Sequence, residues 1–204
     1  MVYIKLEKTD MKILAHMARD MSKEYSIKEL SDQLNTPYVK IHNSVHRLAD
    51  RGMIKKRVLG KSHYCSFDYK SNLDVACFVE AQIARNFLRI NKPVKILIEN
   101  IQERLSIPSY SLVVFGSFAK STQTKSSDLD LAVITEQRTL EKTERTINAV
   151  AETSNIKVHT TAFIYEDFIK MLKSKDVTVG KELAKNHIVL HGCEQFYECI
   201  RMSE

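Results

Sequence analysis

Cysteine, glycine and long apolar runs are all scarce in this sequence of 204 residues. The four cysteines show no C-x-x-C spacing, so neither a zinc ribbon nor a disulfide framework is predicted, and reduced cysteines are expected. No run of 18 apolar residues occurs, and the N-terminus lacks the basic and then apolar segments of a secretion signal. We therefore expect a cytoplasmic protein without a structural metal and without a membrane partner.

The composition is that of an ordinary globular protein, with 27% charged and 44% hydrophobic residues. A chain of this length exceeds one small domain and can form two cores of moderate size. The sequence predicts an N-terminal domain over residues 1–70, a helical connector over residues 71–92 and a C-terminal domain over residues 93–204.

The net charge of +6 is concentrated in one segment. Residues 38–63 hold a single acid, Asp50, against seven basic side chains: Lys40, Arg47, Arg51, Lys55, Lys56, Arg57 and Lys61. A cluster of this kind suits a polyanion, because neutralising phosphates releases counterions. The alternative interpretation is a solvated basic face.

Three helices are predicted around this basic segment. Thr9 or Asp10 is expected to cap the first helix, and Ser26 and Glu29 have the spacing of a capping box for the second. The third helix opens at Pro37 and turns four polar side chains outward near its start: Lys40, Asn43, His46 and Arg47. An alternating segment then predicts a hairpin with a basic tip.

Three helices followed by a basic hairpin resemble the winged helix-turn-helix domains of prokaryotic regulators. The resemblance implies double-stranded DNA as a partner, with the third helix in the major groove. Asn43 would pair with adenine, Arg47 or Lys40 would reach guanine or phosphate, and the hairpin would contact the DNA backbone. The hairpin residues concerned are Lys55, Lys56, Arg57 and Lys61. A protein-docking or spacer module is the alternative.

Residues 73–90 predict a helix with apolar residues over more than one face. Such a helix is either covered by the domains on its two sides or pairs with its copy. A homodimer is the favoured interpretation, because winged-helix regulators commonly read two half-sites.

The segment GSFAKSTQTKSSDLDLAV, residues 116–133, carries the strongest chemical pattern. A buried strand precedes Gly116 and Ser117, and a helix start there would leave backbone N–H groups open to an anion, with Lys120 nearby. Asp128 and Asp130 come two apart at the next strand, so both carboxylates face one side and can share Mg²⁺ or Mn²⁺.

This segment resembles the signature of the DNA polymerase β-like nucleotidyltransferase superfamily, and in particular that of its minimal members. The matching pattern is Gly-Ser, ten intervening residues and then Asp-Leu-Asp-Leu, with Ser127 before Asp128. The resemblance implies an α/β (α+β) fold with a mixed sheet and helices on one side. It also implies transfer of a nucleoside monophosphate from a nucleoside triphosphate to a hydroxyl, with release of pyrophosphate. Ser117 would hold the phosphates, and the two aspartates would hold the metals.

The sequence departs from this superfamily at the third carboxylate. The strand that should supply it, residues 156–165, contains no acid, and His159 occupies the expected position. Three interpretations stay open. His159 is a substitute ligand or base, or one of three nearby acids reaches in (Glu152, Glu166 or Asp167), or the site binds metal and nucleotide without efficient turnover.

Two function classes follow from these patterns. The favoured one is a transcriptional regulator whose C-terminal domain binds a magnesium nucleoside triphosphate. The other is an active nucleotidyltransferase that modifies a hydroxyl of a protein, nucleic acid or small molecule, including an antitoxin-type module beside a small helical toxin protein.

Overall fold

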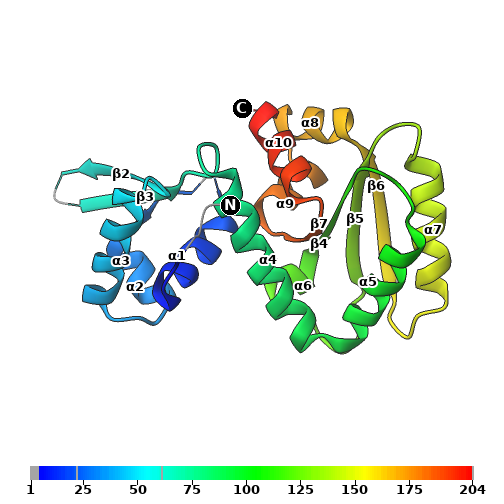
Figure 1. Ribbon diagram of the computed structural model, residues 1–204, viewed down its shortest axis with the longest axis horizontal. Helices are drawn as coiled ribbons and strands as arrows, with labels where there is room; N and C mark the ends of the chain where they lie inside the picture. The colour runs from blue at the N-terminus through cyan, green and yellow to red at the C-terminus, as the bar shows by residue number, and fades with distance from the viewer. Residues whose placement is uncertain (1–4, 22, 61, 204) are drawn as a thin grey trace. The chain divides into compact units, whose positions relative to one another are not determined.

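The computed structural model describes residues 5–21, 23–60 and 62–203. The chain forms two compact units, Met1–Val79 and Glu80–Glu204. The boundary falls inside the helix α4 (Leu73–Ile90; Figure 1), whereas the sequence predicted a separate connector over residues 71–92.

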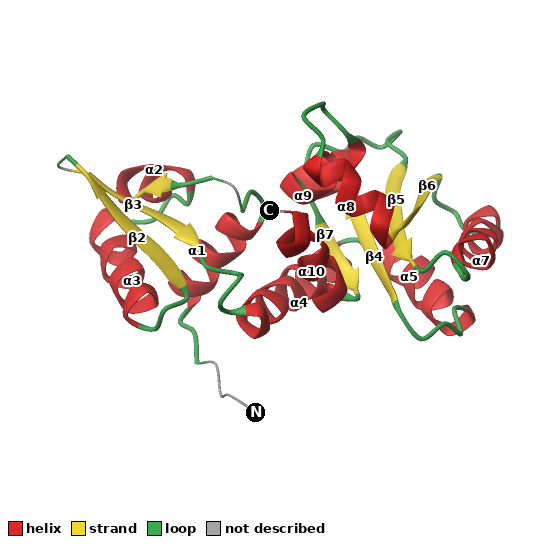
Figure 2. Cartoon of the chain, turned by 90° about the horizontal axis from the view of Figure 1, so that it is seen from above, coloured by secondary structure: helices red, strands yellow, loops and turns green. Residues whose placement is uncertain are grey.

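The N-terminal unit has the predicted three helices and hairpin, and one short strand that was not predicted. Its elements are α1 (Lys8–Ala18), β1 (Tyr25–Ser26), α2 (Ile27–Gln33), α3 (Tyr38–Asp50), β2 (Ile54–Leu59) and β3 (Ser62–Phe67). The strands form an antiparallel sheet in the order β1-β3-β2, and Figure 2 shows the β2–β3 hairpin extending away from the helices.

Local capping explains where two of these helices begin. Ser26 and Glu29 form the predicted capping box at α2, with each side chain accepting a hydrogen bond from the other residue's backbone N–H. The predicted cap of α1 was wrong by a few residues. Glu7 is the cap, and Asp10 completes the box by accepting from the Glu7 N–H at 3.0 Å.

The C-terminal unit is a mixed α/β arrangement around a four-stranded sheet in the order β6-β5-β4-β7. After α4 come α5 (Lys92–Arg104), β4 (Tyr110–Phe115), α6 (Gly116–Lys120), β5 (Leu129–Thr135), α7 (Leu140–Glu152), β6 (Val158–Ile164), α8 (Tyr165–Lys173), α9 (Val179–Lys185), β7 (Ile188–His191) and α10 (Cys193–Ser203). β5 and β6 are parallel, and the other two pairs are antiparallel, as a mixed sheet requires.

Helices cover both faces of this sheet, which corrects the expectation of helices on one side. Leu129 and Leu131 of β5 share a core with Leu97 of α5 and Ile147 of α7. Because side chains alternate along a strand, Asp130 lies on the opposite face. α8 and α10 contact the strands from that side, and Figure 1 shows α10 and α7 on opposite sides of the sheet.

The apolar residues of α4 that prompted the dimer prediction are largely buried within the chain. Ala84 and Phe87 belong to the core of the C-terminal unit, and Ile83 and Leu88 pack against it. Burial of these side chains leaves less apolar surface for a dimer through α4. Among the described residues, no helix combines the length and the apolar character that a membrane span requires.

Candidate active site

The turn after β4 brings Gly116 directly against the second aspartate of the signature. Gly116 has a φ of +65°, a conformation that favours glycine. Phe115 pairs with Asp130 across β4 and β5, and a Cβ atom added to Gly116 would lie 2.1 Å from Asp130 Oδ2. Glycine is therefore required by both backbone conformation and space, and the turn and the carboxylate meet at one place.

Ser117 and Lys120 lie on α6, which follows this turn. Ser117 is half-buried and Lys120 is exposed. The Lys120 ammonium contacts Glu182 Oε1 of α9 at 2.5 Å, a partner that the sequence did not reveal because the two residues are far apart along the chain. Lys120 must exchange this carboxylate for a phosphate if it binds a nucleotide.

The two aspartates sit at the start of β5. Asp128 is exposed just before the strand, and the Asp130 side chain is 29% exposed. Ser127 has an internal role in the loop, because its hydroxyl accepts a hydrogen bond from the Thr124 N–H at 2.9 Å. The predicted nucleotide contact of Ser127 is therefore in competition with a bond that shapes the loop before Asp128.

His159 lies beside Asp130, as the phase of the strand indicated. The two residues are register partners on the parallel strands β5 and β6, and His159 Nδ1 is 3.4 Å from Asp130 Oδ1. The His159 side chain is 68% exposed, so its ring is open to solvent beside the Asp130 carboxylate.

The acids considered as substitutes fall at different ends of β6. Glu152 ends α7, and the following loop enters β6 at the end that holds His159. Glu166 and Asp167 follow the other end of the strand, in the first turn of α8. Glu166 follows the end of β6 at Ile164, which is five residues, or roughly 16 Å, along the strand from His159. Neither acid of α8 can reach Asp130 of the same chain.

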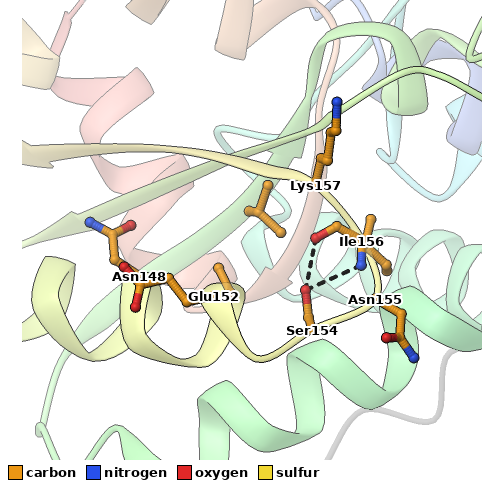
Figure 3. Close-up of a pocket in the computed structure, with 8 residues that line it drawn as sticks. Asn148, Glu152, Ser154, Asn155, Ile156 and Lys157 are labelled. Atoms are coloured by element: carbon orange, nitrogen blue, oxygen red, sulfur yellow. Dashed lines mark hydrogen bonds between the residues drawn. The ribbon is translucent and has the colours of Figure 1, made fainter.

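An open pocket of about 580 Å³ lies between the end of α7 and the start of β6 (Figure 3). Its polar lining includes Asn148, Glu152, Asn155 and Lys157. Val158, which also lines it, packs towards the core shared with α7, so the pocket opens on the sheet face opposite Asp130. The pocket and the carboxylates share one end of the sheet but not one face.

In the N-terminal unit, α3 presents part of the predicted DNA-binding set. Lys40 and Asn43 are exposed. His46 Nδ1 lies 3.1 Å from the Lys56 ammonium of β2, which joins α3 to the hairpin. Desolvation and the Lys56 charge lower the pKa of His46, which favours the neutral ring that can accept a hydrogen bond from Lys56.

Arg47, which the sequence predicted to reach guanine or phosphate, has acidic partners within the N-terminal unit. Its guanidinium donates to both carboxylate oxygens of the fully buried Asp10 and also to Glu7. The hydrogen bonds to Asp10 raise the pKa of Arg47. Arg47 therefore links α3 to α1, and a contact between Arg47 and DNA would require breaking its ion pair with the buried Asp10.

The hairpin cations are exposed but have acidic neighbours. Lys55 pairs with Asp68 at 3.0 Å, and Arg57 pairs with Glu24 at 2.5 Å. The Arg57–Glu24 pair is exposed on both sides, and pairs of this kind are weak and exchange readily for phosphate, whereas the Lys55–Asp68 pair includes a buried carboxylate. Lys61, which was also predicted to contact DNA, lies outside the described residues.

Comparison with known proteins bears on the C-terminal unit alone. Residues 94–185 match the family model described as the nucleotidyltransferase domain. No curated protein and no solved structure gave a match. The matched segment contains the Gly116 turn, both aspartates and His159, and domains of this family use a nucleoside triphosphate and a divalent metal. Residues 94–185 of this chain are therefore similar to a nucleotidyltransferase domain.

Proposed function

We propose that the C-terminal unit binds a nucleoside triphosphate together with Mg²⁺ or Mn²⁺ at Gly116, Ser117, Asp128 and Asp130. The observation that carries this proposal is the contact between the Gly116 turn and the Asp130 carboxylate, where a Cβ would lie 2.1 Å from Oδ2. Backbone N–H groups suited to phosphate and carboxylates suited to a cation then meet at one place, and a metal-bound triphosphate matches both.

The donors at this site fit a metal that arrives with its nucleotide. Among the residues that the structure describes, no group of three or more His, Cys, Asp or Glu side chains is placed to hold a metal. Mg²⁺ is commonly held by one or two carboxylates, with phosphate oxygens and water completing its coordination. Asp128 and Asp130 would provide that pair, and the phosphates would supply further oxygens.

Nucleotide binding with slow transfer is the function that one chain supports best. In the reaction of this domain family, a hydroxyl oxygen bonds to the α-phosphorus while the bond to pyrophosphate breaks. The metals neutralise the charge that develops. One chain supplies two carboxylates and His159, but its β6 has no third acid. The alternative is full transfer to a hydroxyl of a protein, nucleic acid or small molecule, with His159 as metal ligand or base.

Titration with a fluorescent ATP analogue tests the binding proposal. Mg²⁺ should tighten binding to the wild-type chain, and the double variant Asp128→Asn, Asp130→Asn should lose this metal dependence while keeping its fold by circular dichroism. Because clustered carboxylates repel one another, the variant should be at least as stable as the wild type without metal. Equal Mg²⁺ dependence in both proteins would refute the assignment of the metal to these aspartates.

DNA binding by the N-terminal unit is a second candidate function, and it favours a regulatory role for the whole chain. Its support is the exposed Lys40 and Asn43 on α3 together with the Lys56–His46 link to the hairpin, in the element order of a winged helix-turn-helix domain. Replacing Asn43 by Ala should relax base preference in a selection from random duplexes, whereas an unchanged preference would exclude Asn43 from base reading.

A further inference from the structure

The exposed face of α3 carries a valine that the fold does not use. Val39 is 67% exposed, more than any other apolar residue of α3, whereas Ile41, Val45 and Leu48 of the same helix are fully buried. A valine in a helix also costs some stability relative to alanine, because its branched side chain loses rotamer freedom against the preceding turn. Neither the core nor the helix accounts for a branched apolar side chain at this position.

Val39 lies in line with polar residues of α3 that are proposed to contact DNA. Asn43 follows Val39 by four residues and His46 follows Asn43 by three, so the three side chains form one stripe along the helix. Lys40 is exposed beside this stripe and supplies positive charge next to Val39. Val39 is therefore the apolar member of a polar stripe on a basic segment.

A row of three rings borders the stripe. The Tyr38 and His42 rings stack with 6.0 Å between their centroids, and the His42 and His46 rings lie 4.4 Å apart. His46 Nδ1 in turn lies 3.1 Å from the Lys56 ammonium. These contacts restrict the side chains on one side of the stripe, and a helical valine has one strongly preferred rotamer. Ordering this surface on binding should therefore cost little side-chain entropy.

The major groove of DNA offers one apolar group that matches an exposed valine. The base edges there present hydrogen-bond donors and acceptors, and thymine adds its 5-methyl group. Because a helix rises about 1.5 Å per residue, Val39 and Asn43 are about 6 Å apart along α3. Successive base pairs are about 3.4 Å apart. With Asn43 at an adenine, Val39 would meet a base one or two pairs away.

We propose that Val39 determines sequence specificity by contacting the 5-methyl group of a thymine, one or two base pairs from the adenine read by Asn43. This role of Val39 rests on the DNA binding proposed above. The ligand is a duplex with A·T pairs at both positions, while Lys40 contacts phosphate and carries no sequence information. A lone valine beside lysine suits a duplex better than an apolar protein partner, because protein interfaces are depleted of lysine and have a larger apolar centre.

Selection from short random duplexes by the full chain supplies the probe for a test. The selected sequence should contain an A·T pair one or two positions from the pair whose preference Asn43→Ala relaxes. Replacing the thymine of that pair by deoxyuridine removes only the methyl group. This replacement should weaken binding by the wild type about fourfold, the value of one buried methylene-sized group, in fluorescence anisotropy at one fixed salt concentration.

Three variants show whether Val39 reads the methyl group. Val39→Ala should bind the thymine and deoxyuridine duplexes equally, because the side chain that meets the methyl group is gone. Val58→Ala removes a similarly exposed valine from β2 and should keep the fourfold difference. Asn43→Ala should also keep it, since Asn43 would read the other base pair. Val39→Ala leaves the core intact, so its thermal unfolding should match or exceed that of the wild type.

A methyl group on cytosine gives the complementary measurement. With cytosine in place of the thymine, 5-methylcytosine should bind the wild type about fourfold more tightly than cytosine and leave Val39→Ala indifferent. A wild type that selects no such A·T pair or ignores the methyl group, or a Val39→Ala variant that still distinguishes it, overturns the role of Val39 and leaves DNA binding standing. A wild type that binds no duplex refutes the proposed DNA binding and this role together.

Discussion

At the scale of single residues, the candidate site depends on a glycine that makes room for an acid. Gly116 has no side chain where Asp130 Oδ2 lies, so the carboxylate can sit against the turn. His159 lies on the other side of the same carboxylate, 3.4 Å from Oδ1. Asp130 is therefore held between a turn suited to phosphate and an imidazole suited to a metal or a proton.

Adding one methyl group at Gly116 should move the Asp130 carboxylate away from the Gly116 turn. In Gly116→Ala the new Cβ would displace the Asp130 carboxylate, and the positive φ adds about 1 kcal/mol of strain. Metal-dependent nucleotide binding should fall at least tenfold, measured by fluorescence titration. Gly52→Ala is the matched control, because Gly52 has a φ of +68° and nothing within 4 Å of an added Cβ. A similar loss of nucleotide affinity in the control would mean that strain alone explains the effect.

Replacing His159 by aspartate should create the third carboxylate within one chain. The new acid would lie next to Asp130 in the parallel register, so Mn²⁺ binding should tighten about tenfold by electron paramagnetic resonance titration. Without metal the variant should be less stable, because three carboxylates then repel one another. His159→Asn keeps the size without the charge and serves as control. Weaker Mn²⁺ binding in both variants would show instead that the imidazole is already a ligand.

At the scale of helices and strands, the hairpin is the element whose charge the DNA proposal needs. Replacing Lys55, Lys56 and Arg57 by Ala should weaken duplex binding similarly on all sequences. It should also lower the slope of log affinity against log salt by roughly 0.9 for each phosphate that the hairpin no longer neutralises. The measurement is fluorescence anisotropy over a range of salt concentrations. A wild-type slope in the triple variant would exclude the hairpin from the DNA interface.

Local sequence signals predicted most elements of both units, because helix caps and strand patterns act over a few residues. The Ser26–Glu29 capping box, α4 and the strands on either side of Gly116 all follow such signals. The pairing of Arg47 with Asp10 could not be predicted, because it joins residues on separate helices. The contact between Lys120 and Glu182 could not be predicted for the same reason, because these residues also lie on separate helices.

Periodicity left the interpretation of α4 open. A helix that is apolar over most of its circumference needs cover, but the pattern cannot say what covers it. The sequence favoured a second copy, whereas Ala84 and Phe87 enter the core of the C-terminal unit. The resemblance put His159 at the position of the third carboxylate, and in the structure His159 is the register partner of Asp130. Alternation along β6 gives the face of a side chain, whereas the register with β5 had to come from the structure.

At the scale of the whole molecule, each candidate ligand is assigned to one unit. Every group of the nucleotide site comes from Glu80–Glu204, and every group of the DNA surface comes from Met1–Val79. A ligand whose free concentration is one hundred times its dissociation constant stabilises the state that binds it by about 2.7 kcal/mol. That free energy slows hydrogen exchange about one hundredfold at amides that exchange through unfolding of the bound unit.

Hydrogen exchange on the full chain should therefore separate the two activities. Mg²⁺ with a nonhydrolysable ATP analogue should slow exchange in β4, β5 and β6 and leave α3 and the β2–β3 hairpin unchanged, whereas a DNA duplex should do the reverse. The variant Asp128→Asn, Asp130→Asn should lose the first response and keep the second, because only its metal ligands are altered. Slowed exchange in the hairpin on adding nucleotide would contradict independent sites and would show that nucleotide occupancy is communicated to the DNA surface.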